Sequence, residues 1–138
     1  MQLIIPKADL RTFKRKALSS KKEILAVLVG TLQKNSSGEV ESVQVDRFAY
    51  LPVIASKHEV SYTTEDLQQL ALAAMPAHIV GSIHSHLDHE PFISKADVES
   101  AGAEIVFGIY SIWDRSTGKT KTDLTFYTGV KIVEAEVI

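Results

Sequence analysis

The stretch Ile24–Gln33, with the sequence ILAVLVGTLQ, is almost continuously apolar and rich in β-branched residues. A run of this length and composition is typical of a β-strand that is covered on both faces of its sheet. The next residues, Asn35–Gly38 (NSSG), have the composition of a turn, and Glu39–Tyr50 returns as a second strand. The sequence therefore predicts a β-hairpin whose first strand is buried.

Helices are predicted on both sides of this hairpin in the chain. After a short strand at Leu3–Pro6, the segment Lys7–Ser19 spaces its apolar residues about one helical turn apart. A second helix is predicted at Thr64–Met75, which begins with acidic residues and is followed by proline. Leu87–Ile93 is expected to be a polar loop, and Ser94–Asp97 has the Ser-x-x-acid spacing that opens a third helix.

The remaining strands complete a mixed sheet. They are expected at His78–Ser85, at Ile105–Trp113, and in a final hairpin of Lys121–Tyr127 and Val130–Val137. The resulting order, β-α-β-β-α-β-α-β-β-β, predicts an α/β (α+β) fold with a mixed sheet flanked by about three helices. With 138 residues, the chain is expected to form a single domain, residues 1–138.

Composition narrows the possible functions. The chain contains no cysteine, which excludes disulfides, thiolate metal sites and cysteine nucleophiles from these 138 residues. Fifteen basic and seventeen acidic residues leave a net charge of −2, so no bias toward nucleic acid or a membrane surface is present. No apolar run approaches the roughly twenty residues of a membrane-spanning helix, and the N-terminus does not resemble a signal peptide. We therefore expect a cytoplasmic protein.

The segment Gly81–His86 (GSIHSH) carries the most informative chemistry. Residues two apart on a strand point to the same side, so His84 and His86 can meet one cation together. Neutral imidazole is a good zinc ligand, and Asp97, at the start of the following predicted helix, can add a carboxylate. Three protein ligands leave one position for water, which is the arrangement of a catalytic zinc site.

Each of these residues also has a purely structural interpretation. Taken alone, Asp97 can be an acid that favours a helix N-terminus, and Ser94 can be an N-cap. A histidine pair with one intervening residue also arises by chance. Of the other histidines, His89 could touch a substrate but is expected to be an exposed loop residue. His78 is expected to be structural, and nothing in the sequence points to a role for His58. The combined pattern is what favours a metal site.

The pattern His-x-His-x7-Ser-x-x-Asp, formed by His84, His86, Ser94 and Asp97, resembles the motif of the JAMM (JAB/MPN) zinc metallopeptidase family. Upstream, Glu23–Gly30 is similar to that family's glutamate followed by an apolar strand that ends in glycine. The order of the predicted elements also resembles the family fold, so the likeness covers most of the chain. It implies a single JAMM/MPN-like metallopeptidase domain with a cytidine-deaminase-like fold, of the minimal archaeal or bacterial type.

The resemblance also implies roles for individual residues. Glu23 would be the general base and later the acid, and Ser94 would stabilise the oxyanion beside one zinc ion. Ser85, between the two histidines, points to the opposite face and is not expected to be a ligand. Leu87 and Ile93 stand where the family commonly has proline.

The implied activity is hydrolysis after the C-terminal Gly-Gly of ubiquitin-like proteins, of the SAMP type or the sulfur-carrier type. The expected partners are ubiquitin-like conjugates, without nucleic acid or membrane, and a homo-oligomer is compatible with the sequence. Two alternatives stay open: a non-catalytic MPN-type interaction scaffold, and a zinc amidase that acts on a small-molecule amide. A zinc deaminase is disfavoured, because such sites use cysteine ligands.

Overall fold

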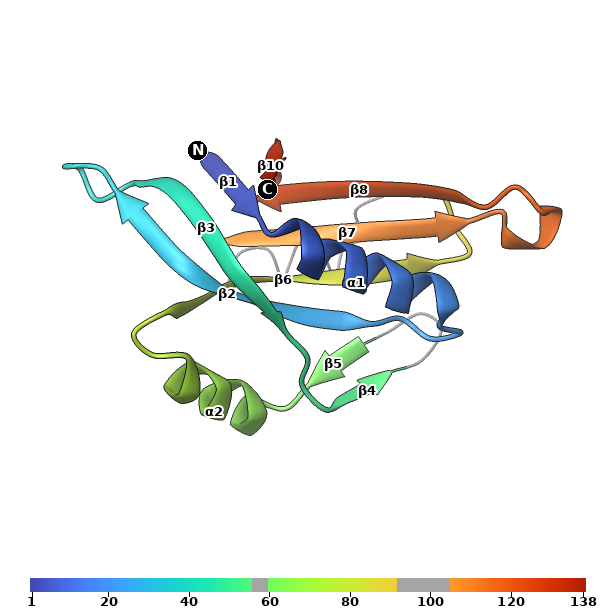
Figure 1. Ribbon diagram of the computed structural model, residues 1–138, viewed down its shortest axis with the longest axis horizontal. Coiled ribbons are helices and arrows are strands. Elements are labelled where there is room, and N and C mark those ends of the chain that lie inside the picture. Colours follow the sequence, from blue (N-terminus) through green and yellow to red (C-terminus); the bar gives the residue numbers. More distant parts are fainter. Residues whose placement is uncertain (56–59, 92–104) are drawn as a thin grey trace.

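The computed structural model describes residues 1–55, 60–91 and 105–138. Within these ranges the chain forms one large sheet, one small sheet, two α-helices and a short 3-10 helix (Figure 1). The elements in chain order are β1 (Gln2–Ile5), α1 (Lys7–Ser19), β2 (Leu25–Lys34), β3 (Val40–Ala49), β4 (Val53–Ala55), β5 (Val60–Tyr62), α2 (Thr64–Ala74), β6 (His78–Leu87), β7 (Val106–Trp113), η1 (Arg115–Thr117), β8 (Lys121–Thr128), β9 (Lys131–Val133) and β10 (Ala135–Val137). The predicted helix that opens at Ser94 lies outside the described residues.

The large sheet is mixed, as the sequence predicted. In the described part of the chain its strand order is β10-β1-β3-β2-β6-β7-β8-β9. The predicted hairpin is confirmed, since β2 pairs antiparallel with β3, and β2 also pairs antiparallel with β6. β6 and β7 then run parallel, so the end of β6 that carries the histidines lies between two buried neighbours. The α/β (α+β) fold class is confirmed.

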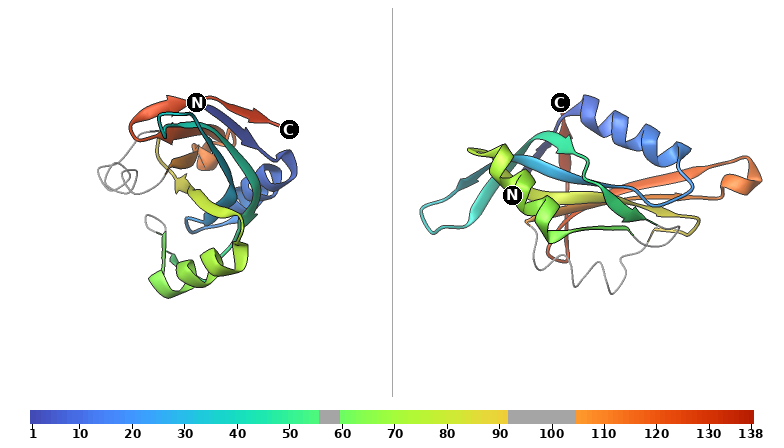
Figure 2. Two further views of the ribbon diagram at one scale, coloured as in Figure 1. Left: turned by 90° about the vertical axis from the view of Figure 1, so that its left-hand side faces the viewer. Right: turned by 90° about the horizontal axis from the view of Figure 1, so that it is seen from below.

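The two described helices cover opposite faces of this sheet (Figures 1 and 2). Leu28 of β2 belongs to the large hydrophobic cluster that includes Phe13 of α1. The alternate residues Val27 and Val29 point to the other face, into the cluster against which Leu67 of α2 packs. Apolar side chains on both faces are what the continuous apolar run in this strand requires, and the prediction of a strand covered on both sides is confirmed.

At Gly81 the backbones of β6 and β7 approach each other closely. A Cβ atom at this position would overlap the carbonyl oxygen of Val106, a backbone group that cannot rotate away. Gly81→Ala should therefore lower the free energy of unfolding by about 1–3 kcal/mol, because the two strands must separate to admit the methyl group. Urea denaturation measures this change, and a variant as stable as the wild type would contradict the close approach.

The C-terminal strand departs from the sequence prediction. Val130–Val137 was expected to be one strand, but Glu134 divides it into β9, which pairs with β8, and β10, which pairs with β1. These are the two opposite edges of the sheet, which curves strongly (Figure 2). Because the curvature brings the edges together, one residue is enough to cross between them.

Two smaller differences also have physical reasons. Leu87 was expected in a loop, but it ends β6 and is fully buried in the core. The pair of β4 and β5 was not predicted, since strands of three residues are too short to show an alternating pattern. Among the helices of the described ranges, none is long and apolar enough to span a membrane.

Candidate metal centre

β6 brings two imidazole rings together near its C-terminal end. The Nε2 atoms of His84 and His86 lie 3.0 Å apart, and their ring centroids are separated by 4.8 Å. His86 is only 5% exposed, and His84 is half-buried. The predicted alternation of the strand therefore holds, and both rings aim the same nitrogen at one point.

The distance between the two Nε2 atoms is close to the distance between two nitrogen ligands of a zinc ion. With Zn–N bonds of about 2.0–2.1 Å and tetrahedral angles, two ligand nitrogens stand about 3.3 Å apart. The histidine pair needs to open by only a few tenths of an ångström to reach that value. Within residues 1–55, 60–91 and 105–138 no group of three histidine, aspartate or glutamate side chains converges, and Asp97 and Ser94 lie outside those ranges. The carboxylate ligand and the oxyanion group therefore stay predictions.

Glu23 lies two residues before the start of β2 and is 4% exposed. Leu25 pairs with His84 in the antiparallel register of β2 and β6, and continuing this register beyond the end of β2 would set Glu23 across from His86. Residues opposite each other in a sheet present their side chains on the same face, with Cβ atoms about 4.5–5.5 Å apart. On that continuation the predicted base shares a face with the two histidines, although Glu23 and His84 are 61 positions apart in the sequence.

Ser85 fastens the segment next to Glu23 to β6. The Ile24 N–H donates to Ser85 Oγ at 2.9 Å, and the Ser85 N–H donates to the Ile24 carbonyl oxygen at 3.0 Å. Ser85 is fully buried, and its side chain points away from the histidines, as predicted. The sequence predicted that Ser85 is not a metal ligand. It did not predict the hydrogen bond to Ile24, because Ile24 is 61 positions away in the chain and contributes a backbone group.

The polar face extends across two more strands. His86 pairs with Ser111 of β7, and Ser111 pairs with Asp123 of β8. These three residues lie on three neighbouring strands, and with Glu23, which precedes β2, they are here called the polar row: Glu23, His86, Ser111 and Asp123. Within the described part of the chain the Ser111 hydroxyl, 1% exposed, has no hydrogen-bond partner. Such a buried hydroxyl reduces stability, so its presence in this row is consistent with a site that serves a ligand.

Ser85 and Ser111 offer a matched pair of substitutions on adjacent strands. Ser85→Ala should lower the free energy of unfolding by about 1–3 kcal/mol, because the Ile24 N–H loses its buried acceptor. Ser111→Ala should leave the free energy of unfolding equal or raise it, because a buried hydroxyl without a described partner is removed. Urea denaturation of both variants measures these changes. Equal losses of stability would contradict the finding that the Ser85 hydroxyl is hydrogen-bonded and that the Ser111 hydroxyl has no partner among the described residues.

His89 lies closer to the site than its position in a polar loop indicated. Its ring centroid is 4.9 Å from that of His86, and its Nδ1 lies 3.0 Å from the Glu90 carbonyl oxygen. The side chain is half-buried, so the expectation of an exposed loop histidine is wrong. The reason is local: Asp88 adopts a left-handed backbone conformation (φ 62°), and the chain turns there directly after β6. His78, by contrast, is exposed at the other end of the strand.

Comparison with known families now adds to this geometry. A model of the prokaryotic homologs of the JAB domain matches residues 7–127, which is most of the chain and includes every element of the site. The chain belongs to this family. JAB/MPN domains include zinc isopeptidases related to deubiquitinases, and they also include members without catalytic activity.

Solved structures support the fold of this JAB-family chain. A JAB1/MPN domain protein from Archaeoglobus fulgidus superposes with a TM-score of 0.57 at 16% identity, covering 100% of this chain and 97% of the other. A protein from Desulfitobacterium hafniense, determined in solution, gives a TM-score of 0.59 at 17% identity, covering 99% and 93%. No curated protein matches the sequence. At these identities the likeness concerns the fold alone.

Proposed function

We propose that this JAB-domain protein is a zinc-dependent isopeptidase that removes ubiquitin-like modifiers by hydrolysis after their C-terminal Gly-Gly. The observation that carries the proposal is the pairing of His84 and His86, whose Nε2 atoms lie 3.0 Å apart, together with the buried Glu23 on the segment that is hydrogen-bonded to β6 at Ser85. Two nitrogen ligands and a buried carboxylate beside them are the chemistry of a zinc hydrolase. A purely structural role would not require polar groups to be buried in one row.

His84 and His86 would hold the metal through Nε2, and Asp97 would complete the ligand set. Zinc bound there would supply a water of lowered pKa and polarise the scissile carbonyl. Glu23 would accept the proton of the attacking water and deliver it to the departing amine, a transfer for which a buried carboxylate beside the ligands is well placed. Ser94 would donate its hydroxyl to the oxyanion.

The proposed substrate class rests on the family resemblance and on the shape of a Gly-Gly tail. A Gly-Gly tail is flat and extended, so it can lie alongside a strand and add its backbone hydrogen bonds to those of the protein. We propose that the modifiers are small proteins of the SAMP or sulfur-carrier type, released from lysines or from C-terminal extensions. The natural partners would then be the conjugates themselves, met in the cytoplasm.

The test is an assay of the purified full chain, with and without a chelator, against a panel of ubiquitin-like–lysine conjugates and linear fusions. We expect one zinc per chain and cleavage that the chelator abolishes and added zinc restores. Hydrolysis that survives both chelation and Glu23→Ala would refute the proposal. A metal-free protein that is inert on every conjugate but co-purifies with a stoichiometric partner would favour the scaffold. Faster turnover of short amides than of folded conjugates would favour the amidase.

A further inference from the structure

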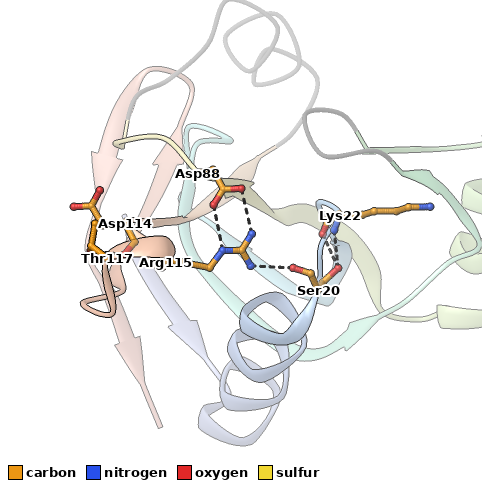
Figure 3. Close-up of polar contacts among 6 residues, drawn as sticks. All are labelled: Ser20, Lys22, Asp88, Asp114, Arg115 and Thr117. Atoms are coloured by element: carbon orange, nitrogen blue, oxygen red, sulfur yellow. Dashed lines mark hydrogen bonds and ion pairs between the residues drawn. The ribbon is translucent and has the colours of Figure 1, made fainter.

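Arg115, in η1 after β7, bridges two segments that adjoin the candidate metal centre (Figure 3). Its Nε and Nη2 atoms donate to the two carboxylate oxygens of Asp88, at 3.2 and 3.3 Å. Its remaining terminal nitrogen, Nη1, donates to the carbonyl oxygen of Ser20 at 3.1 Å. One planar guanidinium therefore joins three points of the chain.

Asp88 directly follows the histidine-bearing strand β6. It follows His86 by two residues, and its backbone N–H donates to the Ile112 carbonyl oxygen at 2.7 Å. Its φ of 62° is left-handed, a conformation that aspartate and asparagine tolerate better than most residues. Its carboxylate is thereby held at a defined place beside β7, where Arg115 meets it.

Ser20 opens the segment that leads to Glu23. Its hydroxyl donates to the Lys22 carbonyl oxygen at 2.7 Å and accepts from the Lys22 N–H at 3.1 Å, so residues 20–22 form a compact turn. Arg115 holds the first residue of this turn, and Ser85 holds Ile24 directly after Glu23. Glu23 is thus fixed from both sides, by two contacts that involve opposite ends of the segment.

We propose that Arg115 is a positioning residue for Glu23: its guanidinium sets the distance between the carboxylate-bearing turn and the histidine-bearing strand. The expected effect on kcat rests on the proposed function, whereas the expected local opening of residues 20–24 rests on these contacts alone. Arginine suits the role because its planar guanidinium can donate hydrogen bonds to Asp88 and Ser20 at the same time. A lysine ammonium is a compact charge on a flexible side chain and cannot fix both contacts in one geometry. Arg115 and Asp88 are 27% and 33% exposed, so the pair adds little to global stability.

Hydrogen exchange of the full-length protein tests the structural consequence without any substrate. In Arg115→Met, amides of residues 20–24 should exchange about three- to tenfold faster, because the turn opens locally, while the melting temperature stays near that of the wild type. Arg115→Lys should restore this protection only in part. Asp88→Asn should also accelerate exchange of residues 20–24, and asparagine tolerates the left-handed backbone at this position. This variant provides the test if Arg115→Met does not fold.

The matched control is Lys121→Met, which removes a neighbouring exposed ion pair of 3.3 Å to Asp114 and leaves Ser20 and Asp88 untouched. It should leave exchange of residues 20–24 at the wild-type rate. Unchanged exchange in Arg115→Met and Asp88→Asn, or an increase spread evenly over the chain, would overturn the proposal.

A kinetic measurement on the wild-type enzyme's best conjugate gives the second readout. Arg115→Met should lower kcat about tenfold to a hundredfold with KM and zinc affinity near wild type, because Glu23 is displaced while the metal ligands stay in place. Equal kcat in both proteins would overturn the positioning role. If the wild type cleaves no conjugate, the isopeptidase proposal fails, and the exchange experiment still decides whether Arg115 holds the Glu23 segment.

Discussion

Replacing Glu23 by glutamine should lower kcat by at least about a hundredfold, and by up to about 10⁴-fold, without removing the zinc. Glutamine keeps the size of the side chain but cannot accept the proton of the attacking water. Glu23 is nearly fully buried, so a water molecule from bulk solvent cannot easily take over its function. Steady-state kinetics on a ubiquitin-like–lysine conjugate, with zinc quantified by mass spectrometry, measures both quantities.

Glu39→Gln is the control for this substitution. Glu39 is an exposed acid at the far end of the β2–β3 hairpin, and the same chemical change there should leave kcat unaltered. Wild-type kcat in Glu23→Gln would show that another group transfers the proton. Loss of zinc together with activity would show that Glu23 is a ligand, and the assignment of roles would have to be revised.

His86→Ala should remove zinc from the purified protein. The substitution deletes one of the two Nε2 donors that lie 3.0 Å apart, so affinity should fall by more than the roughly 10–100-fold that follows loss of an outer-shell contact. Because a ligand that binds only the folded state stabilises it, added zinc should raise the melting temperature of the wild type and not that of His86→Ala. Titration against a competing chelator measures the affinity, and thermal denaturation measures the shift.

His78→Ala is the matched control, since His78 is exposed at the opposite end of the same strand. It should keep the wild-type zinc content and the zinc-dependent rise in melting temperature. An unchanged zinc affinity in His86→Ala would contradict a metal centre at the end of β6, and with it the proposed chemistry. His84→Ala should behave as His86→Ala does, because both rings aim the same nitrogen at one point.

Predictions from the sequence succeeded where a single element carries its own pattern. The helix at Lys7–Ser19 was predicted with the bounds that α1 has, because its apolar residues recur at one helical turn and pack into the core. The apolar run after Glu23 predicted β2 to within one residue at each end. The prediction failed at Val130–Val137, since the division into β9 and β10 depends on how far the sheet curves, and no local pattern encodes that curvature.

For the site, the sequence by itself determined which residue types are available and which of them share a strand face. Without cysteine, a metal in this chain needs nitrogen and oxygen ligands, and the spacing of His84 and His86 places both rings on one side of β6. Only the tertiary structure decided that Glu23 is buried, that Ser85 and Arg115 hold the segment around it, and that His89 packs against His86. The physical reason is that these relations arise from pairing and hydrogen bonds between residues far apart in the chain, whereas the periodicity of a sequence reports only on neighbours within one element.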